Sequence, residues 1–427
     1  MISQLTVALA IGTLLVSGVL TFFLKNVSSI RTVGFVTALA NFVGVLLIPV
    51  TSGNTFGNQH IFIDVDQVNR IPMLASSLLL FVTFLMAPDS ALHSGFVWKS
   101  LVSIAATQIA YTAGSPWLMS LGIAIAWLPF YQELSPVTRI TFALASVLLP
   151  VGLNLGDKGI WMVFAAIILR KGLFPAHGWI TRTMGAGHWL TAMLVINTHI
   201  GAFVLLRTSH TSAVWLTDLA LGTAVYAAAL GMRDLSPRRT LGWLSISQSA
   251  FLLAGIGSQT SEGIAGSLLL WQVVVASTTI LAGIMAALES RMSVSLTLKH
   301  SSGLAARFPR LAVGFIIAGL ALVGAPMTLG FYGEDLLMHG TLAAHPRIGI
   351  LLPIATAMNA ITVFRMFSRL FLGPITEDLT DVPDALPRER LAITAVISFL
   401  ILGGLVPGWL LPKTAATHDA VTTHPGN

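Results

Sequence analysis

Long apolar runs, separated by short polar segments, follow one another along almost the whole chain. Most have about 17–25 residues, the length that an α-helix needs to cross a hydrocarbon core roughly 30 Å thick. They predict helices near 5–24, 31–51, 71–88, 97–113, 115–132, 138–155, 158–176, 189–207, 214–232, 241–257, 264–288, 310–330, 347–372 and 391–411. We therefore expect an all-α membrane protein with about 14 transmembrane helices, in a single polytopic membrane domain over residues 1–427.

The positions of Lys and Arg test this count, because cytoplasmic loops carry an excess of both residues. Of the 23 such residues, 15 fall in the odd-numbered loops and their edges, and 5 fall in the even-numbered loops and the tail. The other 3, Arg170, Lys171 and Arg365, lie inside predicted helices. The split favours fourteen helices, and it predicts that both termini lie on the non-cytoplasmic side of the cell membrane.

Composition supports the membrane interpretation and excludes several functions. Apolar residues make up 55% of the chain and charged residues 9%, whereas soluble domains have about 25% charged residues. The net charge of +6 is spread over short loops, so we expect no nucleic-acid partner. The absence of cysteine excludes disulfides, Cys-ligated zinc and iron–sulfur clusters. No Gly-rich nucleotide-binding turn is visible, and we expect no cofactor, no metal and no catalytic site in this chain.

Arg170 and Lys171 place two charges where charge is costly. At 1.5 Å per residue, Arg170 lies roughly 18 Å beyond Lys158, still inside the hydrocarbon core. An ionised side chain there costs about 2.5–3.5 kcal/mol. Adjacent side chains point about 100° apart on a helix, so the two cations need different partners. Pro175 predicts a break in this helix, which is tolerated at membrane depth where the backbone lines a polar cavity. The alternative is that both cations extend to the surface.

Other ionisable residues near predicted helices are Glu334, Asp335, His177, His188 and His199. The acidic pair follows the predicted twelfth helix, and composition alone favours a plain outer loop there. A lone helical histidine is more often a hydrogen-bonded structural group than a proton relay. Three histidines near an intramembrane cation pair leave both roles open, but their spacing does not fit a metal site.

Several segments resemble the antiporter-like subunits, which comprise subunits L, M and N of respiratory complex I, subunits A and D of multisubunit sodium/proton antiporters, and membrane-hydrogenase relatives. The sequence RKGLFPAHGWI at 170–180 is similar to their seventh-helix signature, a Lys, four residues and Pro-x-His-x-Trp. Arg170 stands at the position of the family's lysine, and Lys171 follows it. Further resemblances are SISQ at 245–248, GFYGEDLL at 330–337, FRMF at 364–367 and IDVD at 63–66.

The resemblance implies a fold and a set of site residues. The fold is that of inverted repeats with broken helices, whose halves cover roughly 97–232 and 241–372. The implied proton or ion path contains Arg170, Lys171, His177, His199, Glu334, Asp335 and Arg365. Within it, Arg170 and Lys171 are the central cations, Glu334 is the outer-side acid, the two histidines are relays and Arg365 is a charge partner.

The chain also departs from the family pattern. The fifth-helix Trp-Glu has no counterpart in Leu121–Ala124, and Glu133 lies two turns or more beyond it. The eighth-helix histidine position is occupied by Leu194 or Val195. Gln272–Ala276 stands where the family has H-A-F-F-K and lacks both its His and its Lys.

The resemblance implies a proton-conducting membrane subunit of a multi-protein energy-coupling complex in a bacterial inner membrane, such as an NADH:quinone oxidoreductase-like translocase. The departures leave two alternatives: the membrane subunit of a DAB-type inorganic-carbon (bicarbonate or CO2) uptake complex energised by cation flux, or a non-conducting scaffold from the same family. Expected partners are other membrane subunits, a redox or large carbonic-anhydrase-like soluble subunit, protons or sodium ions, and the lipid bilayer.

Overall fold

The computed structural model describes residues 2–50, 63–208, 214–292, 295–374 and 382–406. Within these ranges the regular structure is helical, apart from an isolated antiparallel bridge between Ile63 and Ala113. The helices are α1 (Ile2–Phe23), α2 (Val27–Leu47), α3 (Arg70–Met86), α4 (Ser94–Thr112), α5 (Pro116–Ala126), α6 (Pro136–Asn154), α7 (Ile160–Lys171), α8 (Gly178–Ala186), α9 (Trp189–Ile196), α10 (Ile200–Thr208), α11 (Val214–Gly231), α12 (Pro237–Gly257), α13 (Ser261–Glu289), α14 (Pro309–Leu322), α15 (Leu329–Ala344), α16 (Leu351–Phe371) and α17 (Pro387–Leu405).

Each of the fourteen apolar segments predicted from sequence coincides with helical structure. In the described part of the chain, 8 helical segments are long and apolar enough to cross a membrane, and three shorter apolar helices accompany them. The all-α class is confirmed, while the number of crossings stays a prediction.

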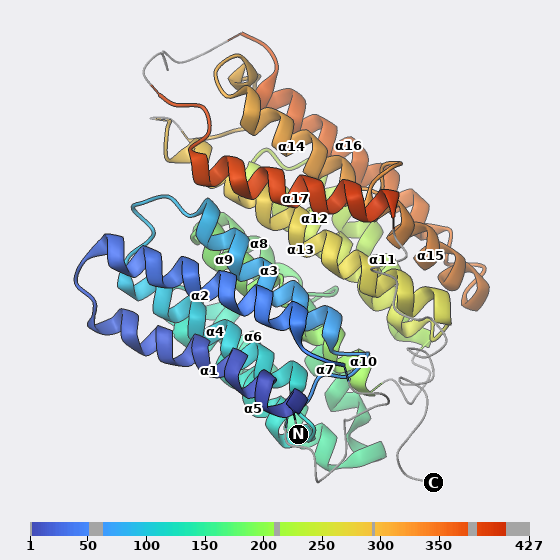
Figure 1. Ribbon diagram of the computed structural model, residues 1–427. Coiled ribbons are helices and arrows are strands. Elements are labelled where there is room, and N and C mark those ends of the chain that lie inside the picture. The colour runs from blue at the N-terminus through green and yellow to red at the C-terminus, as the bar shows by residue number, and fades with distance from the viewer. Residues whose placement is uncertain (1, 51–62, 209–213, 293–294, 375–381, 407–427) are drawn as a thin grey trace.

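The helices form an elongated bundle in which most of the long helices run roughly side by side, with α1–α6 on one side and α14–α17 on the other (Figure 1). Helix α13 is the central element: it packs on α3, α9, α12, α14, α15 and α17, and its residues from Gly263 to Leu288 are buried. A helix that is apolar on all sides has no face to offer to water, which fits this central position. Helix α1, by contrast, exposes Leu9, Val16 and Phe23, as expected of a helix that faces lipid.

Three predicted spans are interrupted. Helix α7 ends at Lys171, where Gly172 adopts a left-handed φ of 63°, so the break predicted near Pro175 is confirmed. Helices α9 and α10 are separated at His199, which has a φ of 47°. The predicted helix 310–330 is wrong in its boundaries, because α14 stops at Leu322, before Gly324 and Pro326. Proline cannot continue a helical hydrogen-bond ladder.

Most of the predicted odd-numbered loops gather at one end of the bundle, which we call the basic end. Ion pairs hold these loops together: Lys99–Glu133, Arg238–Glu289, Arg291–Glu389 and the two contacts of Asp89 with Arg31 and Arg388. The charge alternation along the chain thus corresponds to a spatial clustering of cations.

Candidate functional site

The two adjacent cations at the end of α7 are both buried, with Arg170 8% exposed and Lys171 3% exposed. Neither side chain reaches the surface, so the alternative in which both extend to it is wrong. The two cations use different partners, as their angular separation requires. The Arg170 guanidinium lies 4.0 Å from the centre of the Phe142 ring, and the Lys171 Nζ lies 2.5 Å from the His199 Nδ1.

His199 occupies the break between α9 and α10, which brings its ring to Lys171. The Nδ1 of His199 also lies 3.5 Å from the hydroxyl of Ser249 on α12, and its buried Nε2 has no hydrogen-bond partner among the described residues. Gly201 makes the approach possible, because a Cβ there would lie 2.6 Å from the Cγ of Lys171. The break in the helix and the small residue after it together create the Lys171–His199 contact.

Arg170 borders a small cavity with a mixed lining. Its volume is about 10 Å³, close to the space that one water needs. The hydroxyl-bearing and apolar residues that line it with Arg170 include Ser103, Thr107, Leu194 and Val195. The Nε and Nη1 of Arg170 are buried and have no hydrogen-bond partner within the described ranges. The Tyr111 hydroxyl donates to the Thr198 carbonyl oxygen, just before the break at His199.

Glu334 lies in α15 and is 8% exposed, so the plain outer-loop alternative is wrong. Its Oε2 accepts a hydrogen bond of 3.2 Å from the Thr356 hydroxyl on α16. The backbone of Gly324, in the break between α14 and α15, passes close to the carboxylate, because a Cβ there would lie 2.5 Å from Oε2. The Oε1 is buried without a hydrogen-bond partner in the described part of the chain.

Helix α12 packs against α7 and α8 on one side of the site and against α15 on the other, and it carries polar residues that face both sides. Ser249 faces His199, and the side chain of Gln248, its neighbour in sequence, lies next to Glu334. Both amide atoms of Gln248 are buried without a partner of hydrogen-bonding geometry in the described ranges. Ser247 accepts a bond of 2.8 Å from Asn359, one turn after Thr356 on α16. The end of the SISQ segment, together with Ser249, thus places polar groups between the Lys171–His199 pair and Glu334.

The structure does not bring the other three predicted path residues into this line. His177 lies partly exposed at the start of α8 and stacks on Phe174. Asp335 points outward, with its side chain 44% exposed and 3.6 Å from His339. Arg365 donates to the carbonyl oxygens of Gly231 and Asp234 and therefore closes the end of α11 at the basic end.

Comparison with known proteins places this site in a family. The sequence model described as "NADH:quinone oxidoreductase/Mrp antiporter, TM" matches residues 95–359, more than half of the chain. The chain belongs to this family. The antiporter-like family that the 170–180 segment and its companions predicted is therefore confirmed.

Two curated relatives show how far the sequence of this chain has diverged within the family. NADH-quinone oxidoreductase subunit M of Rickettsia bellii is 25% identical over 266 residues, which cover 59% of this chain and 53% of that protein. NAD(P)H-quinone oxidoreductase chain 4 of Glycine max chloroplasts is 27% identical over 379 residues, covering 81% and 73%. The chain thus spans about half the length of the Rickettsia protein that it matches.

Two solved structures share the fold. A chain of respiratory complex I from Thermus thermophilus superposes with a TM-score of 0.85 at 19% identity, covering 97% of this chain and 98% of the other. A chain of the Mrp complex from Dietzia sp. superposes with a TM-score of 0.85 at 17% identity, covering 98% and 97%. With its apolar helices, this antiporter-family chain is a membrane protein.

The departures from the family pattern have identifiable structural consequences. Glu133, beyond the acid-free Leu121–Ala124 segment, pairs at 2.7 Å with Lys99 and accepts a hydrogen bond from Thr191 at the basic end. Gln272, in the segment that lacks the family's His and Lys, approaches the Ile71 carbonyl at 3.4 Å. Neither substitution adds an ionisable group to the line between Lys171 and Glu334.

His188 lies outside the membrane-spanning segments, just before α9. Desolvation by the surrounding protein and then the Arg238 guanidinium lower its pKa, although Glu133 and Glu289 act in the opposite direction. Its neighbour Trp189 donates to Glu289 at 2.6 Å. A histidine held neutral here can lie between two ion pairs without adding charge to the basic end.

Sequence reasoning missed several polar contacts inside this antiporter-family fold. Arg207 at the end of α10 pairs with Asp66 at 2.8 Å, with side chains 1% and 0% exposed; the two residues are 141 positions apart, so spacing gave no signal. Asn41, Ser77 and Gln108 form a buried hydrogen-bonded cluster. A single amide in an apolar run was the signal that could have found it, since such groups need a partner in a membrane.

Proposed function

We propose that this chain is a proton-conducting membrane subunit of a multi-protein energy-coupling complex. The observation that carries the proposal is the sequence of buried polar groups from Arg170 and the Lys171–His199 pair, past Ser249 and Gln248, to Glu334. Buried ionisable groups are rare in membrane-spanning segments and mark ion pathways or proton relays. Membership of the antiporter family supports the same function.

In this mechanism, the site moves a proton by changing which group holds it. Lys171 and His199 are close enough to share a proton, and the neighbouring Arg170 charge disfavours a second cation beside it. A proton released by the pair travels past Ser249 and Gln248, whose hydroxyl and amide can each donate and accept hydrogen bonds. Glu334 takes it up on the far side of α12. The protonation of each group then depends on that of its neighbours.

The proposed path begins at the break between α7 and α8 and ends at the break between α14 and α15. We propose that α7–α8 and α14–α15 belong to inverted-repeat halves of roughly 97–232 and 241–372, whose interrupted helices meet near the bilayer midplane. Breaks at this depth are tolerated because the free backbone groups line the polar interior and not the lipid.

The partners are proposed to be other subunits of a membrane complex, because relatives carry the word subunit in their names. We favour protons over sodium ions as the conducted species, because the path consists of exchangeable amine, imidazole, hydroxyl and carboxyl groups and lacks a cluster of oxygen ligands. No contact among the described residues favours the inorganic-carbon alternative. The scaffold alternative rests on the ionisable residues of the family that this chain lacks. Ion flux measured in an assembled complex distinguishes it from conduction.

The decisive experiment replaces Glu334 by Gln in the complete complex. Gln keeps the size of the side chain but cannot carry the proton, so ion flux should fall at least about tenfold while the complex assembles normally. Glu334→Asp should retain part of the flux. Assembly is measured by pull-down, and proton and sodium flux by ion-sensitive dyes in vesicles from the same strains.

Asp335→Asn is the matched control, since it removes a neighbouring carboxylate that points outward. It should leave flux within about twofold of the unmodified protein, because an exposed pair such as Asp335 with His339 contributes little. Normal flux in an assembled Glu334→Gln complex would refute conduction through this residue and favour the scaffold alternative.

A further inference from the structure

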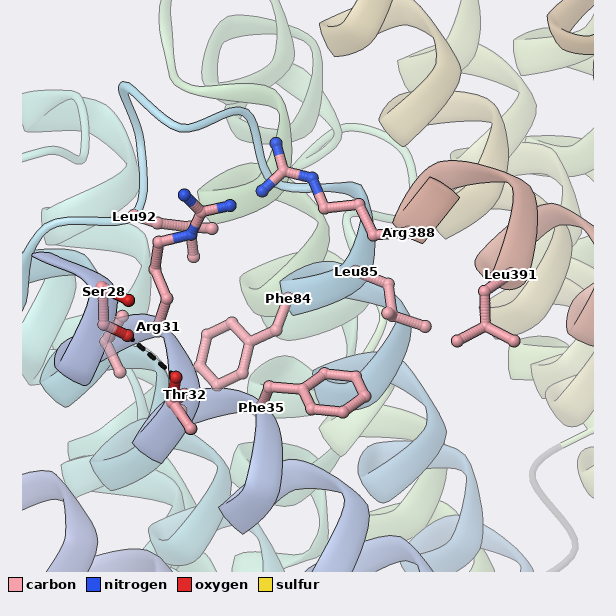
Figure 2. Close-up of a pocket in the computed structure, with 11 residues that line it drawn as sticks. Ser28, Arg31, Thr32, Phe35, Phe84, Leu85, Leu92, Arg388 and Leu391 are labelled. Atoms are coloured by element: carbon pink, nitrogen blue, oxygen red, sulfur yellow. Dashed lines mark hydrogen bonds between the residues drawn. The ribbon is translucent and has the colours of Figure 1, made fainter. Parts of the chain in front are cut away.

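A groove of about 390 Å³ lies at the basic end of the bundle, away from the buried polar line. Its walls come from α2 and α17, and α3 contributes Phe84 and Leu85 to its floor (Figure 2). Both α2 and α17 pack against α3. The exposed surface of α17 includes Leu391, so the groove faces the lipid side of the protein.

Two arginines stand at the rim of this groove. Arg31 lies in the first turns of α2 and Arg388 in the first turn of α17, and Figure 2 shows both side chains at the same rim, above the apolar residues. They share one carboxylate: Asp89 Oδ1 lies 2.8 Å from Arg31 Nη2 and 2.7 Å from Arg388 Nη1. Two guanidinium groups against one carboxylate leave a net positive charge, and the buried Nε of Arg388 has no hydrogen-bond partner in the described ranges.

Apolar side chains continue the groove one helical turn further along the same helices. Phe35 follows Arg31 by four residues and Leu391 follows Arg388 by three, so each lies on the same face as its arginine. With Phe84 and Leu85 they line the lower part of the groove. Both helices start at the basic end. The arginines therefore lie near the membrane edge, and the apolar side chains lie deeper in the membrane.

We propose that this groove binds an anionic phospholipid, with its phosphate on Arg31 and Arg388 and an acyl chain along Phe35 and Leu391. Basic pockets between transmembrane helices recognise anionic headgroups, and guanidinium groups match phosphate oxygens by paired hydrogen bonds. A free anion would leave the apolar wall unused, and a zwitterionic lipid would bring a cation to a rim that is already positive. The inference does not depend on proton conduction.

The test compares two double variants of the purified full-length protein. Arg31→Gln with Arg388→Gln removes the rim charges, and Arg182→Gln with Arg233→Gln removes two exposed charges from the same end of the bundle, outside the groove. Native mass spectrometry counts retained phosphatidylglycerol and phosphatidylcholine. The unmodified protein and the control pair should retain phosphatidylglycerol preferentially. The rim pair should bind it about 10- to 30-fold more weakly, because each arginine contributes about 1 kcal/mol of attraction to an anionic headgroup and about 1.36 kcal/mol corresponds to a tenfold change.

Two further variants keep both arginines. Leu391→Trp fills the apolar part and should reduce retention of the diacyl lipid, while excess sn-glycerol 3-phosphate should fail to displace lipid from the unmodified protein. Asp89→Asn removes the competing carboxylate and should raise phosphatidylglycerol retention.

Equal phosphatidylglycerol retention by the rim pair and the control pair would overturn the proposal, provided that thermal unfolding shows both proteins to be folded. In the assembled complex, loss of a partner subunit from the rim pair with lipid binding unchanged would also overturn it, since that result assigns the groove to a protein contact.

Discussion

Arg170 and Lys171 are neighbours in sequence, yet the fold gives them different environments. The guanidinium of Arg170 makes a cation–π contact with the ring of Phe142, whereas the ammonium group of Lys171 is hydrogen-bonded to the imidazole of His199. An arginine keeps its proton under all ordinary conditions, while a buried lysine can give its proton up. We therefore propose that Lys171 carries the exchangeable proton and that Arg170 keeps a fixed positive charge.

This difference leads to a prediction for Lys171→Met, which keeps the length of the side chain and removes the proton. Flux through the assembled complex should fall at least tenfold, because His199 then has no proton donor beside it. Lys158→Met is the control: Lys158 is exposed ahead of the same helix, and its removal should change flux by less than about twofold. Vesicle flux measurements at equal protein content compare the two. Unchanged flux in Lys171→Met would show that the lysine has only a packing role.

Helix breaks decide which residues meet at the scale of the elements. Left-handed backbone at Gly172, His199 and Gly324 interrupts three apolar segments, and each interruption lies next to one of the buried ionisable residues. The close approach of α10 to α7 also requires a residue without a side chain at position 201. A site of this kind depends on local backbone geometry as much as on the charged residues themselves.

Gly201→Ala tests the requirement at position 201. The added methyl group would collide with Lys171 Cγ, and such overpacking typically costs about 1–3 kcal/mol. The thermal unfolding temperature of the detergent-purified protein should therefore fall, and flux should fall with it because Lys171 moves away from His199.

Gly222→Ala in α11 serves as the matched control, because a Cβ there would meet no atom within 4 Å. An open helical position gains roughly 0.5–1 kcal/mol from this change, so the unfolding temperature should stay equal or rise. If Gly201→Ala behaved like Gly222→Ala, the packing of α10 on Lys171 would be looser than the structure indicates.

At the scale of the whole molecule, charge marks one end of the bundle. Ion pairs among distant loops, such as Arg31 with Asp89 and Arg291 with Glu389, collect cations there. Cytoplasmic loops carry the excess of Lys and Arg, so we predict that the basic end faces the cytoplasm.

Single cysteines test this orientation cleanly, because the chain has none of its own. Ser236→Cys lies at the basic end, before α12, and should be protected from an impermeant maleimide in intact cells. Asp157→Cys is exposed between α6 and α7, at the opposite end, and should be labelled; Asn427→Cys, outside the described residues, should be labelled as well. Equal labelling at positions 157 and 236 would contradict the predicted topology, and permeabilised cells provide the control for reactivity.

The sequence by itself determined the all-α membrane class, the positions of the apolar segments and the break after Lys171, because each depends on local composition and on proline. It also singled out Arg170 and Lys171, since ionisable residues inside an apolar run stand out, whereas His199 and Glu334 entered the predicted path through the family resemblance. It could not predict that Glu334 lies inside a further helix, because α15 buries only one face, with Gly333, Glu334 and Leu337, in a fold where it packs against α13.

Tertiary structure alone decided which of the singled-out residues meet. Lys171 contacts His199 across 28 positions, and Arg207 contacts Asp66 across 141, while Asp335, next to Glu334 in sequence, points outward. Such pairings depend on helix breaks and on small residues such as Gly201, which let two helices approach closely. The sequence of one segment contains no signal that identifies its partner segment. Local patterns set which helices form and how far they can run through the membrane, whereas packing between distant helices sets which charges share an interior and which face outward.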